Sequence, residues 1–189
     1  LHEDSGLTFS KNEYEFIAGL ANDTRTDEDI PANYIDVLDD LSTGIYDGVQ
    51  FSGHGVFRAT DPNHSGMELA EGDRLVPEDL SGSVRNLGKA KPLVFLNACQ
   101  LGRSAMSLTD VGGWAPRFLN AGAGAFVSAY WQVYDDSAFA FAKELYTRLL
   151  DGEPMGKAVR GARLAARAGG DPSWLAYTVF AHPEATVRN

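Results

Sequence analysis

Four consecutive apolar residues, Leu93 to Leu96, constrain the possible folds more than any other feature of the sequence. A run of this kind is typical of a β-strand that is covered on both faces, as strands of parallel sheets are. It ends at Asn97-Ala98-Cys99-Gln100, where small and polar residues begin. The shorter run Val49-Gln50-Phe51 ends in the same way, at Ser52-Gly53-His54-Gly55. Because ligands of open parallel sheets bind at the carboxyl ends of the strands, both polar strings are expected at one edge of one sheet.

That placement brings His54 next to Cys99, the only cysteine of the chain. A thiol nucleophile and its base need this arrangement, and small flanking residues leave room for a substrate backbone. Each residue taken alone also has a structural interpretation, because a single cysteine commonly packs as a small hydrophobe and a single histidine is often structural. Pattern and spacing therefore leave both a catalytic pair and two structural residues open.

The rest of the sequence alternates between predicted helices and strands, which indicates an α/β fold with a mostly parallel sheet and helices on both faces. Residues 67–76 have the pattern of a small hairpin, and residues 100–109 are expected to form an irregular loop. The predicted helices cover residues 12–20, 31–44, 114–119, 135–150 and 154–168, and the predicted strands cover 49–54, 93–96, 125–131 and 174–181.

The composition is that of one globular domain, and the net charge of −10 argues against direct nucleic-acid binding, since phosphate contacts need clustered lysine and arginine. No apolar stretch approaches the roughly 18 residues of a membrane span, so no membrane partner is expected. A single cysteine excludes an internal disulfide and fits the reducing cytoplasm. The sequence starts with Leu1 and lacks an initiator methionine, so we expect an excerpt or cleaved part of a longer chain.

Four strings of the sequence resemble the CHAT family of caspase-like cysteine peptidases, which belongs to the same clan as caspases, separase and gingipains. The resemblance runs in order from about Lys11 to Pro183. It implies a single CHAT-type peptidase domain over residues 1–189 with a caspase-like fold. The strings are FSGHG at 51–55, PLVFLNACQLG at 92–102, GGWAPRFLNAGAGAFVSAYWQVYDD at 112–136 and DPSWLAYTVFAHP at 171–183.

The resemblance implies a catalytic dyad, with Cys99 as nucleophile and His54 as general base and then general acid. It also implies that the backbone N–H groups of Cys99 and Gly55 bind the oxyanion. The family needs no cofactor and no metal. The loop spacing of His54, Asp61 and His64 makes a poor ligand set, so no metal site is expected.

Asp135 and Asp136 have two interpretations. Either carboxylate can cap the helix that starts here, with a gain of about 1 kcal/mol. Alternatively, the spacing of Trp131 and Asp135 resembles the acidic specificity pocket of separase, which accepts a basic P1 side chain. We expect one of the two carboxylates to line such a pocket.

The sequence departs from the family pattern at three places. Gln100-Leu101-Gly102 replaces the usual Ser-Gly or Thr-Gly after the nucleophile, and Tyr134 stands where many relatives have a different residue. The strand expected before the first helix is missing unless Leu7-Thr8-Phe9 supplies it.

Together these features predict a cysteine endopeptidase that cleaves a protein or peptide partner, preferably after a basic P1 residue. The resemblance adds a fused or associated sensor region that regulates the peptidase, and a role in bacterial defence. The main alternative is a non-catalytic caspase-like module that binds a partner, although such a module has no need of both His54 and Cys99. A thiol acyltransferase that uses the same two residues is a second alternative.

Overall fold

The computed structural model describes residues 8–23, 25–56, 58, 64–98, 105–106 and 111–187. These residues form two compact units. The first, called the sheet unit here, comprises Ile30–Gln132 and Tyr177–Phe180. The second, called the helical unit, comprises the described residues up to Asp29, together with Val133–Ala176 and the residues from Ala181 onward.

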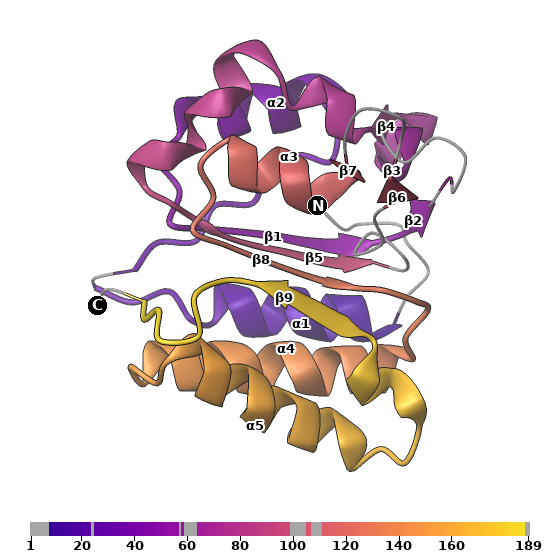
Figure 1. The fold of residues 1–189 in the computed structure, drawn as a ribbon, viewed down its shortest axis with the longest axis vertical. Helices are drawn as coiled ribbons and strands as arrows, with labels where there is room; N and C mark the ends of the chain where they lie inside the picture. The colour runs from indigo at the N-terminus through magenta and orange to yellow at the C-terminus, as the bar shows by residue number, and fades with distance from the viewer. Residues whose placement is uncertain are drawn as a thin grey trace. The chain divides into compact units, whose positions relative to one another are not determined.

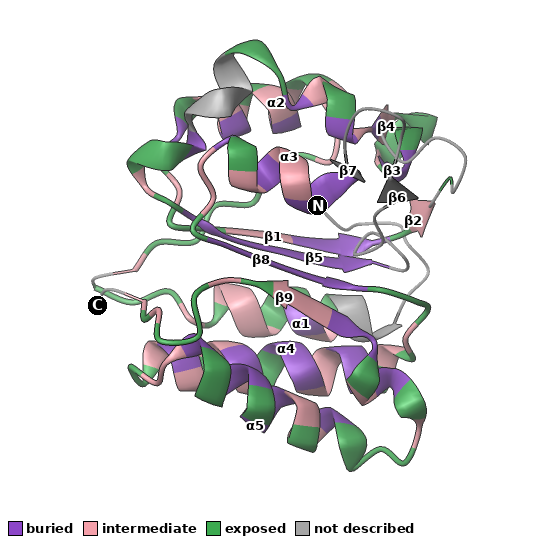
Figure 2. Cartoon of the chain, viewed as in Figure 1, coloured by how far each residue is buried: buried purple, intermediate pink, exposed green. Residues whose placement is uncertain are grey.

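A four-stranded sheet forms the centre of the sheet unit, in the order β1, β5, β8, β9 (Figure 1). Three strands run parallel, β1 (Gly48–Gly53), β5 (Leu93–Ala98) and β8 (Ala125–Ala129), and β9 (Tyr177–Phe180) pairs antiparallel with β8. Every residue of β5 and β8 is buried, as Figure 2 shows. Their continuous apolar sequences follow from this, because neither face of these strands meets solvent. The predicted mainly parallel sheet is confirmed.

The last strand is shorter than its predicted range of 174–181. It begins at Tyr177, and a single 3₁₀ turn, η5 (Pro172–Leu175), precedes it. Asp171 caps this turn, because its carboxylate accepts a hydrogen bond of 2.7 Å from the backbone N–H of Ser173. Proline at the first position of the turn has a fixed φ that suits it. Capping chemistry therefore overrides the aromatic and β-branched composition that predicted a strand here.

Short elements surround the sheet within the sheet unit. The hairpin predicted over residues 67–76 is confirmed, because β3 and β4 pair antiparallel. The predicted loop 100–109 is wrong in one part, since Ala105 and Met106 form a short strand with residues 111–112. The short elements are β2 (Gly55–Val56), β3 (Gly66–Glu68), η2 (Ala70–Gly72), β4 (Arg74–Leu75), η3 (Pro77–Asp79), η4 (Gly82–Lys89), β6 (Ala105–Met106) and β7 (Val111–Gly112).

The described sheet unit contains the α-helices α2 and α3, and the ends of α2 follow from local chemistry. Helix α2 (Tyr34–Thr43) starts after Asn33, whose side-chain oxygen accepts the backbone N–H of Asp36 at 2.9 Å. It ends at Gly44, whose φ of 62° is in the left-handed region that favours glycine. The predicted start at residue 31 is therefore three residues early. Helix α3 (Trp114–Asn120) lies within one residue of its prediction.

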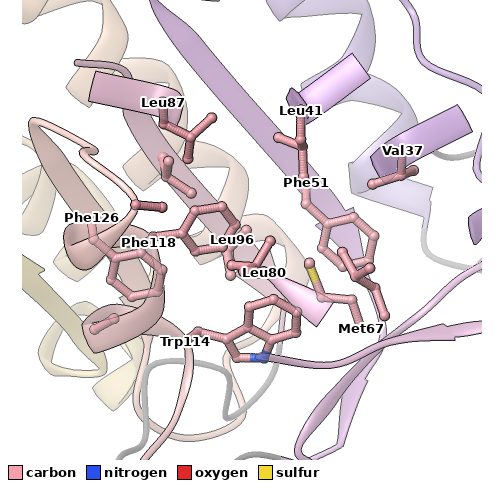
Figure 3. Close-up of a cluster of buried hydrophobic side chains, with 14 of the residues drawn as sticks. Val37, Leu41, Phe51, Met67, Leu80, Leu87, Leu96, Trp114, Phe118 and Phe126 are labelled. Atoms are coloured by element: carbon pink, nitrogen blue, oxygen red, sulfur yellow. The ribbon is translucent and has the colours of Figure 1, made fainter. Parts of the chain in front are cut away.

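A hydrophobic core packs on one face of the sheet (Figure 3). Phe51, Leu96 and Phe126 come from three adjacent strands and meet side chains of α2 and α3. The rings of Trp114 and Phe118 stack at 5.8 Å between centroids, and those of Phe118 and Phe126 stack at 6.0 Å. This core holds the three parallel strands in one register, and the register in turn fixes the carboxyl edge of the sheet.

Helices make up most of the helical unit: α1 (Thr8–Ala18), α4 (Asp135–Leu150) and α5 (Met155–Arg167). The idea that residues 7–9 supply an opening strand is wrong for Thr8 and Phe9, which lie in α1, and Leu7 lies outside the described residues. Phe16 of α1 meets Phe139 of α4 edge to face at 6.3 Å between ring centroids. Among the described residues, no helix has both the length and the apolar character that crossing a membrane demands.

Candidate functional site

The pairing of β1 with β5 places the two polar strings at the same level of the sheet. The last two paired positions are Ser52 with Asn97 and Gly53 with Ala98. The next residue in the sequence is His54 after β1 and Cys99 after β5. His54 is exposed, and Cys99 lies outside the described residues. His54 and Cys99 therefore each follow directly after the last paired residue of their strand.

Gly55 follows His54 and starts the short strand β2, where it pairs with Met67 of β3. The backbone N–H of Glu68 donates to the carbonyl of His54 at 3.0 Å. In an antiparallel ladder, a bond at this place makes Gly55 and Met67 a non-hydrogen-bonded pair. The N–H of Gly55 consequently points away from β3. Among the described strands, β3 is the only one that pairs with β2.

A buried hydrogen bond supports the end of β5. The hydroxyl of Tyr177 on β9 donates to Oδ1 of Asn97 at 2.8 Å. The ring of Tyr177 meets Phe95 edge to face, with 5.9 Å between centroids. On β8, the Ser128 hydroxyl donates to the carbonyl of Leu96 at 2.7 Å. The last residues of β5 before Cys99 are thus held by side chains from two other strands.

Asp135 and Asp136 occupy the first turn of α4 in the helical unit. The predicted capping role is wrong in its details, because the N-cap position is Tyr134, which makes no side-chain capping bond. Oδ1 of Asp136 accepts the backbone N–H of Ser137 at 2.8 Å. Asp135 is half-buried, and within the described part of the chain its carboxylate makes no hydrogen bond or ion pair. Of the two neighbouring carboxylates, only that of Asp136 therefore has a hydrogen-bond partner among the described residues.

Asp171 organises the chain before and within this first turn. Its carboxylate accepts hydrogen bonds from the Ser137 hydroxyl and from the backbone N–H of Ser173. The Ser173 hydroxyl in turn accepts the backbone N–H of Tyr134 at 3.1 Å. The Ser137 hydrogen bond, and then those from Ser173, lower the pKa of Asp171. Sequence reasoning missed this residue, although Asp171-Pro172-Ser173 carries the signal of a capped turn.

No metal site is found among the residues that the structure describes, since no three His, Cys, Asp or Glu side chains gather there. His64 approaches Glu78 at 3.9 Å instead, and Asp61 lies outside the described residues. The candidate residues divide between the two units: His54 and Gly55 belong to the sheet unit, and Asp135 and Asp136 to the helical unit.

Comparison with solved structures defines the class of the fold. The chain is similar to the Arg-specific cysteine proteinase gingipain R, with a TM-score of 0.65 and 16% identity over 98% of this chain and 43% of that one. It is similar to the complex of Porphyromonas gingivalis gingipain pro- and mature domains, with a TM-score of 0.63 and 16% identity over 98% and 44%. A further structure described as a protease gives a TM-score of 0.55 and 13% identity over 78% and 36%. The fold is thus caspase-like, a mainly parallel sheet flanked by helices.

The CHAT domain matches residues 3–184, and the chain belongs to the CHAT family. It spans less than half the length of the gingipain chains. Comparison with curated proteins gives no match. The expected caspase-like fold and CHAT membership are both confirmed.

Proposed function

We propose that this chain is the catalytic domain of a cysteine endopeptidase, with Cys99 as the nucleophile and His54 as its base. One observation carries the proposal: the β1–β5 register ends on paired residues that immediately precede His54 and Cys99. CHAT membership and the likeness to gingipain R, itself described as a cysteine proteinase, support it. An exposed imidazole is also accessible to a substrate.

In this mechanism His54 takes the proton of the Cys99 thiol, and the thiolate attacks the carbonyl carbon of the scissile peptide. A carbon–sulfur bond forms while the carbonyl oxygen becomes an oxyanion. His54 then returns the proton to the leaving amine as the carbon–nitrogen bond breaks. Water, deprotonated by His54, attacks the thioester and releases the acid and the thiol. Atoms and charges balance in these steps without an oxidant, a reductant or a cofactor.

Gly55 is proposed to supply one oxyanion donor and the backbone of Cys99 the other. The geometry of β2 supports this, because the Gly55 N–H is not used in the ladder to β3. Glycine also leaves no Cβ beside the place where a substrate carbonyl approaches. Fixed backbone donors of this kind contribute about 2.7–4 kcal/mol each to acyl transfer.

We further propose a preference for arginine or lysine at P1, read by Asp135. Asp136 already accepts a backbone hydrogen bond from the next residue, whereas the half-buried Asp135 carboxylate has its acceptors available. A carboxylate facing a guanidinium forms charge-assisted hydrogen bonds, and these are about twice as strong as neutral ones. The bonds of Asp171 and Ser173 to the start of α4 would hold this carboxylate in place.

The test of the dyad uses Cys99→Ala, His54→Ala and the double variant on peptide substrates. Each single variant should lose at least about 1,000-fold in kcat, and the double variant should lose no more, because the two residues act as a unit. His182→Ala, at an exposed histidine of the helical unit, is the matched control and should keep full activity. Turnover near wild type in Cys99→Ala would overturn the assignment.

A thiol-reactive probe separates the alternatives, because the chain has one cysteine. A peptidase should be labelled at Cys99 and cleave peptides. A non-catalytic module should remain unlabelled by a mechanism-based probe, and an acyltransferase should be labelled without cleaving peptides. Each of these two results would replace the proposed activity.

The test of P1 preference compares Asp135→Asn with Asp136→Asn on matched P1-Arg and P1-Leu peptides. Losing one partner of a desolvated charge pair costs about 3–5 kcal/mol, so Asp135→Asn should lower the Arg-to-Leu ratio of kcat/KM by hundreds-fold or more. Asp136→Asn should leave that ratio within about twofold. An unchanged ratio in both variants, or a wild-type preference for P1 Leu, would exclude the acidic pocket.

Regulation by a sensor region remains part of the proposal, together with a cytoplasmic location and a role in bacterial defence. CHAT membership is what supports the sensor region. The 189-residue chain should then cleave peptides far more slowly than the triggered protein that contains it. Equal kcat/KM for the two would exclude this form of regulation.

A further inference from the structure

The side chain of Tyr177 makes a long-range connection that packing alone does not require. The residue is only 2% exposed, and its hydroxyl donates to Asn97 Oδ1 across 80 residues of sequence. Asn97 is itself 8% exposed. Phenylalanine would fill the same space without needing a partner, whereas a buried hydroxyl is costly unless it is hydrogen-bonded. The role of this hydrogen bond therefore has to be sought in the position of Tyr177 and Asn97 in the sheet.

The strand register shows how the two side chains meet. Leu96 pairs with Ser128, so one step further along the parallel strands Asn97 is level with Ala129. Ala129 in turn pairs with Tyr177. The three residues form one row across the sheet, and the small side chain of Ala129 lets the tyrosine hydroxyl reach over β8 to β5. Phe95, two residues before Asn97, fixes the tyrosine ring from the side.

This row is the last but one before the candidate catalytic residues, since Gly53 and Ala98 form the final pair. On β1 the partner of Asn97 is Ser52, and His54 follows it by two residues. On β5, Cys99 follows Asn97 by two residues. A hydrogen bond that fixes the Asn97 side chain therefore acts on the strand end from which the chain continues to the nucleophile. Small displacements at this point are expensive, because a misplacement of about 1 Å can cost 100-fold in rate.

We propose that Tyr177 is a positioning residue for the nucleophile: its hydrogen bond to Asn97 fixes the end of β5 and thereby the placement of Cys99 relative to His54. The inference rests on the proposed peptidase function. It assigns to the antiparallel strand β9 a part in catalysis that the sequence motifs around His54 and Cys99 do not contain.

The main test is Tyr177→Phe, which removes one oxygen and keeps the ring against Phe95. We expect kcat to fall about 10- to 100-fold with KM unchanged. The alkylation rate of Cys99 by iodoacetamide should also shift to higher pH, because His54 assists deprotonation less well. Tyr46→Phe is the matched control, since it removes a tyrosine hydroxyl that donates to Asp40 at 3.0 Å in the same unit. The control should keep wild-type kcat and alkylation.

A second variant separates positioning from simple stability. Tyr177→Phe leaves the Asn97 carbonyl without this donor, whereas Tyr177→Phe combined with Asn97→Leu replaces both partners by apolar groups and should restore the melting temperature. A positioning role predicts that kcat stays low in this double variant. Recovery of kcat together with stability would show that the bond is only structural, and so would a wild-type alkylation profile in Tyr177→Phe.

The alkylation measurement also keeps the two hypotheses apart. It follows the single thiol directly and needs no peptide substrate. If the wild-type chain cleaves no peptide, the proposed function fails, while a shifted alkylation profile still supports the link between Tyr177 and Cys99. If peptides are cleaved and Tyr177→Phe behaves like wild type in both assays, the inference fails alone.

Discussion

The two units of the chain contain different kinds of buried contact. In the sheet unit, Trp114, Phe118 and Phe126 stack in a continuous series and each is at most 1% exposed. In the helical unit, α5 packs against α4, and its buried residues include the small side chains of Ala158 and Ala162, both fully buried. Large rings fill the wide space between a sheet and its helices, whereas small side chains let two helices approach closely.

This difference shows which kind of change each unit tolerates. A core of rings loses most when a side chain is removed, because a cavity remains. A helix contact lined by alanine loses most when a side chain is added, because the helices must move apart. Changes of opposite sign in side-chain volume therefore probe the two units separately.

The largest expected effect is that of Phe126→Ala in the sheet unit. Removing a fully buried ring costs about 3–5 kcal/mol, which combines lost burial with the cavity left behind. Urea unfolding followed by circular dichroism measures the change. Ile45→Ala is the control, because that side chain is 66% exposed and its loss should change stability by no more than about 0.5 kcal/mol. Equal losses in both variants would contradict the description of the core.

A smaller effect is expected for Ala162→Leu in the helical unit. Ala162 is fully buried, so the added carbon atoms have no free space, and overpacking of this kind costs about 1–3 kcal/mol. Arg160→Leu places the same side chain on the exposed side of α5 and should be nearly neutral. If Ala162→Leu were as stable as wild type by urea unfolding, the helix contact would be looser than the structure shows.

The smallest effect, about 1–2 kcal/mol, is expected for Asp171→Ala, which removes the cap of η5 and the bond to Ser137. The folded-state pKa of Asp171 is lowered, so its contribution is present above the unfolded value of about 3.9 and is lost as pH falls through the folded pKa. Stability curves of wild type and variant should therefore converge below about pH 4. A difference that stayed constant from pH 7 to pH 2 would exclude the ionised carboxylate as its cause.

Sequence patterns predict an element correctly where the residues that determine it lie within that element. The apolar run Leu93–Leu96 predicted β5, and residues 135–150 were predicted as the helix that α4 forms. The aromatic composition near Trp174 predicts a start of β9 three residues too early, because it outweighs the capping signal of Asp171. Hydrophobic periodicity gives no signal for an element boundary that a single side-chain hydrogen bond determines.

The candidate site likewise has features that local sequence motifs predict and features that they do not. Short motifs around His54 and Cys99 predicted their neighbouring strands, and the β1–β5 register agrees with that placement. Nothing in the sequence near Asn97 points to Tyr177, because their contact spans 80 residues and appears only when the strand order is known. The difference between Asp135 and Asp136, of which only Asp136 accepts a hydrogen bond from the described residues, likewise depends on the folded helix.

The contact between Tyr177 and Asn97 has a consequence for the newly made chain. Ribosomes produce β1, β5 and β8 well before β9, and a contact across 80 residues must close a long loop before it gives any stability. At about 5–20 residues per second, the end of β5 exists for roughly 4–16 s before Tyr177 is added. During that interval the proposed nucleophile is present on the chain without the strand that steadies it. If the proposed activity is correct, the strand end that precedes Cys99 is among the last parts of this domain to become fixed.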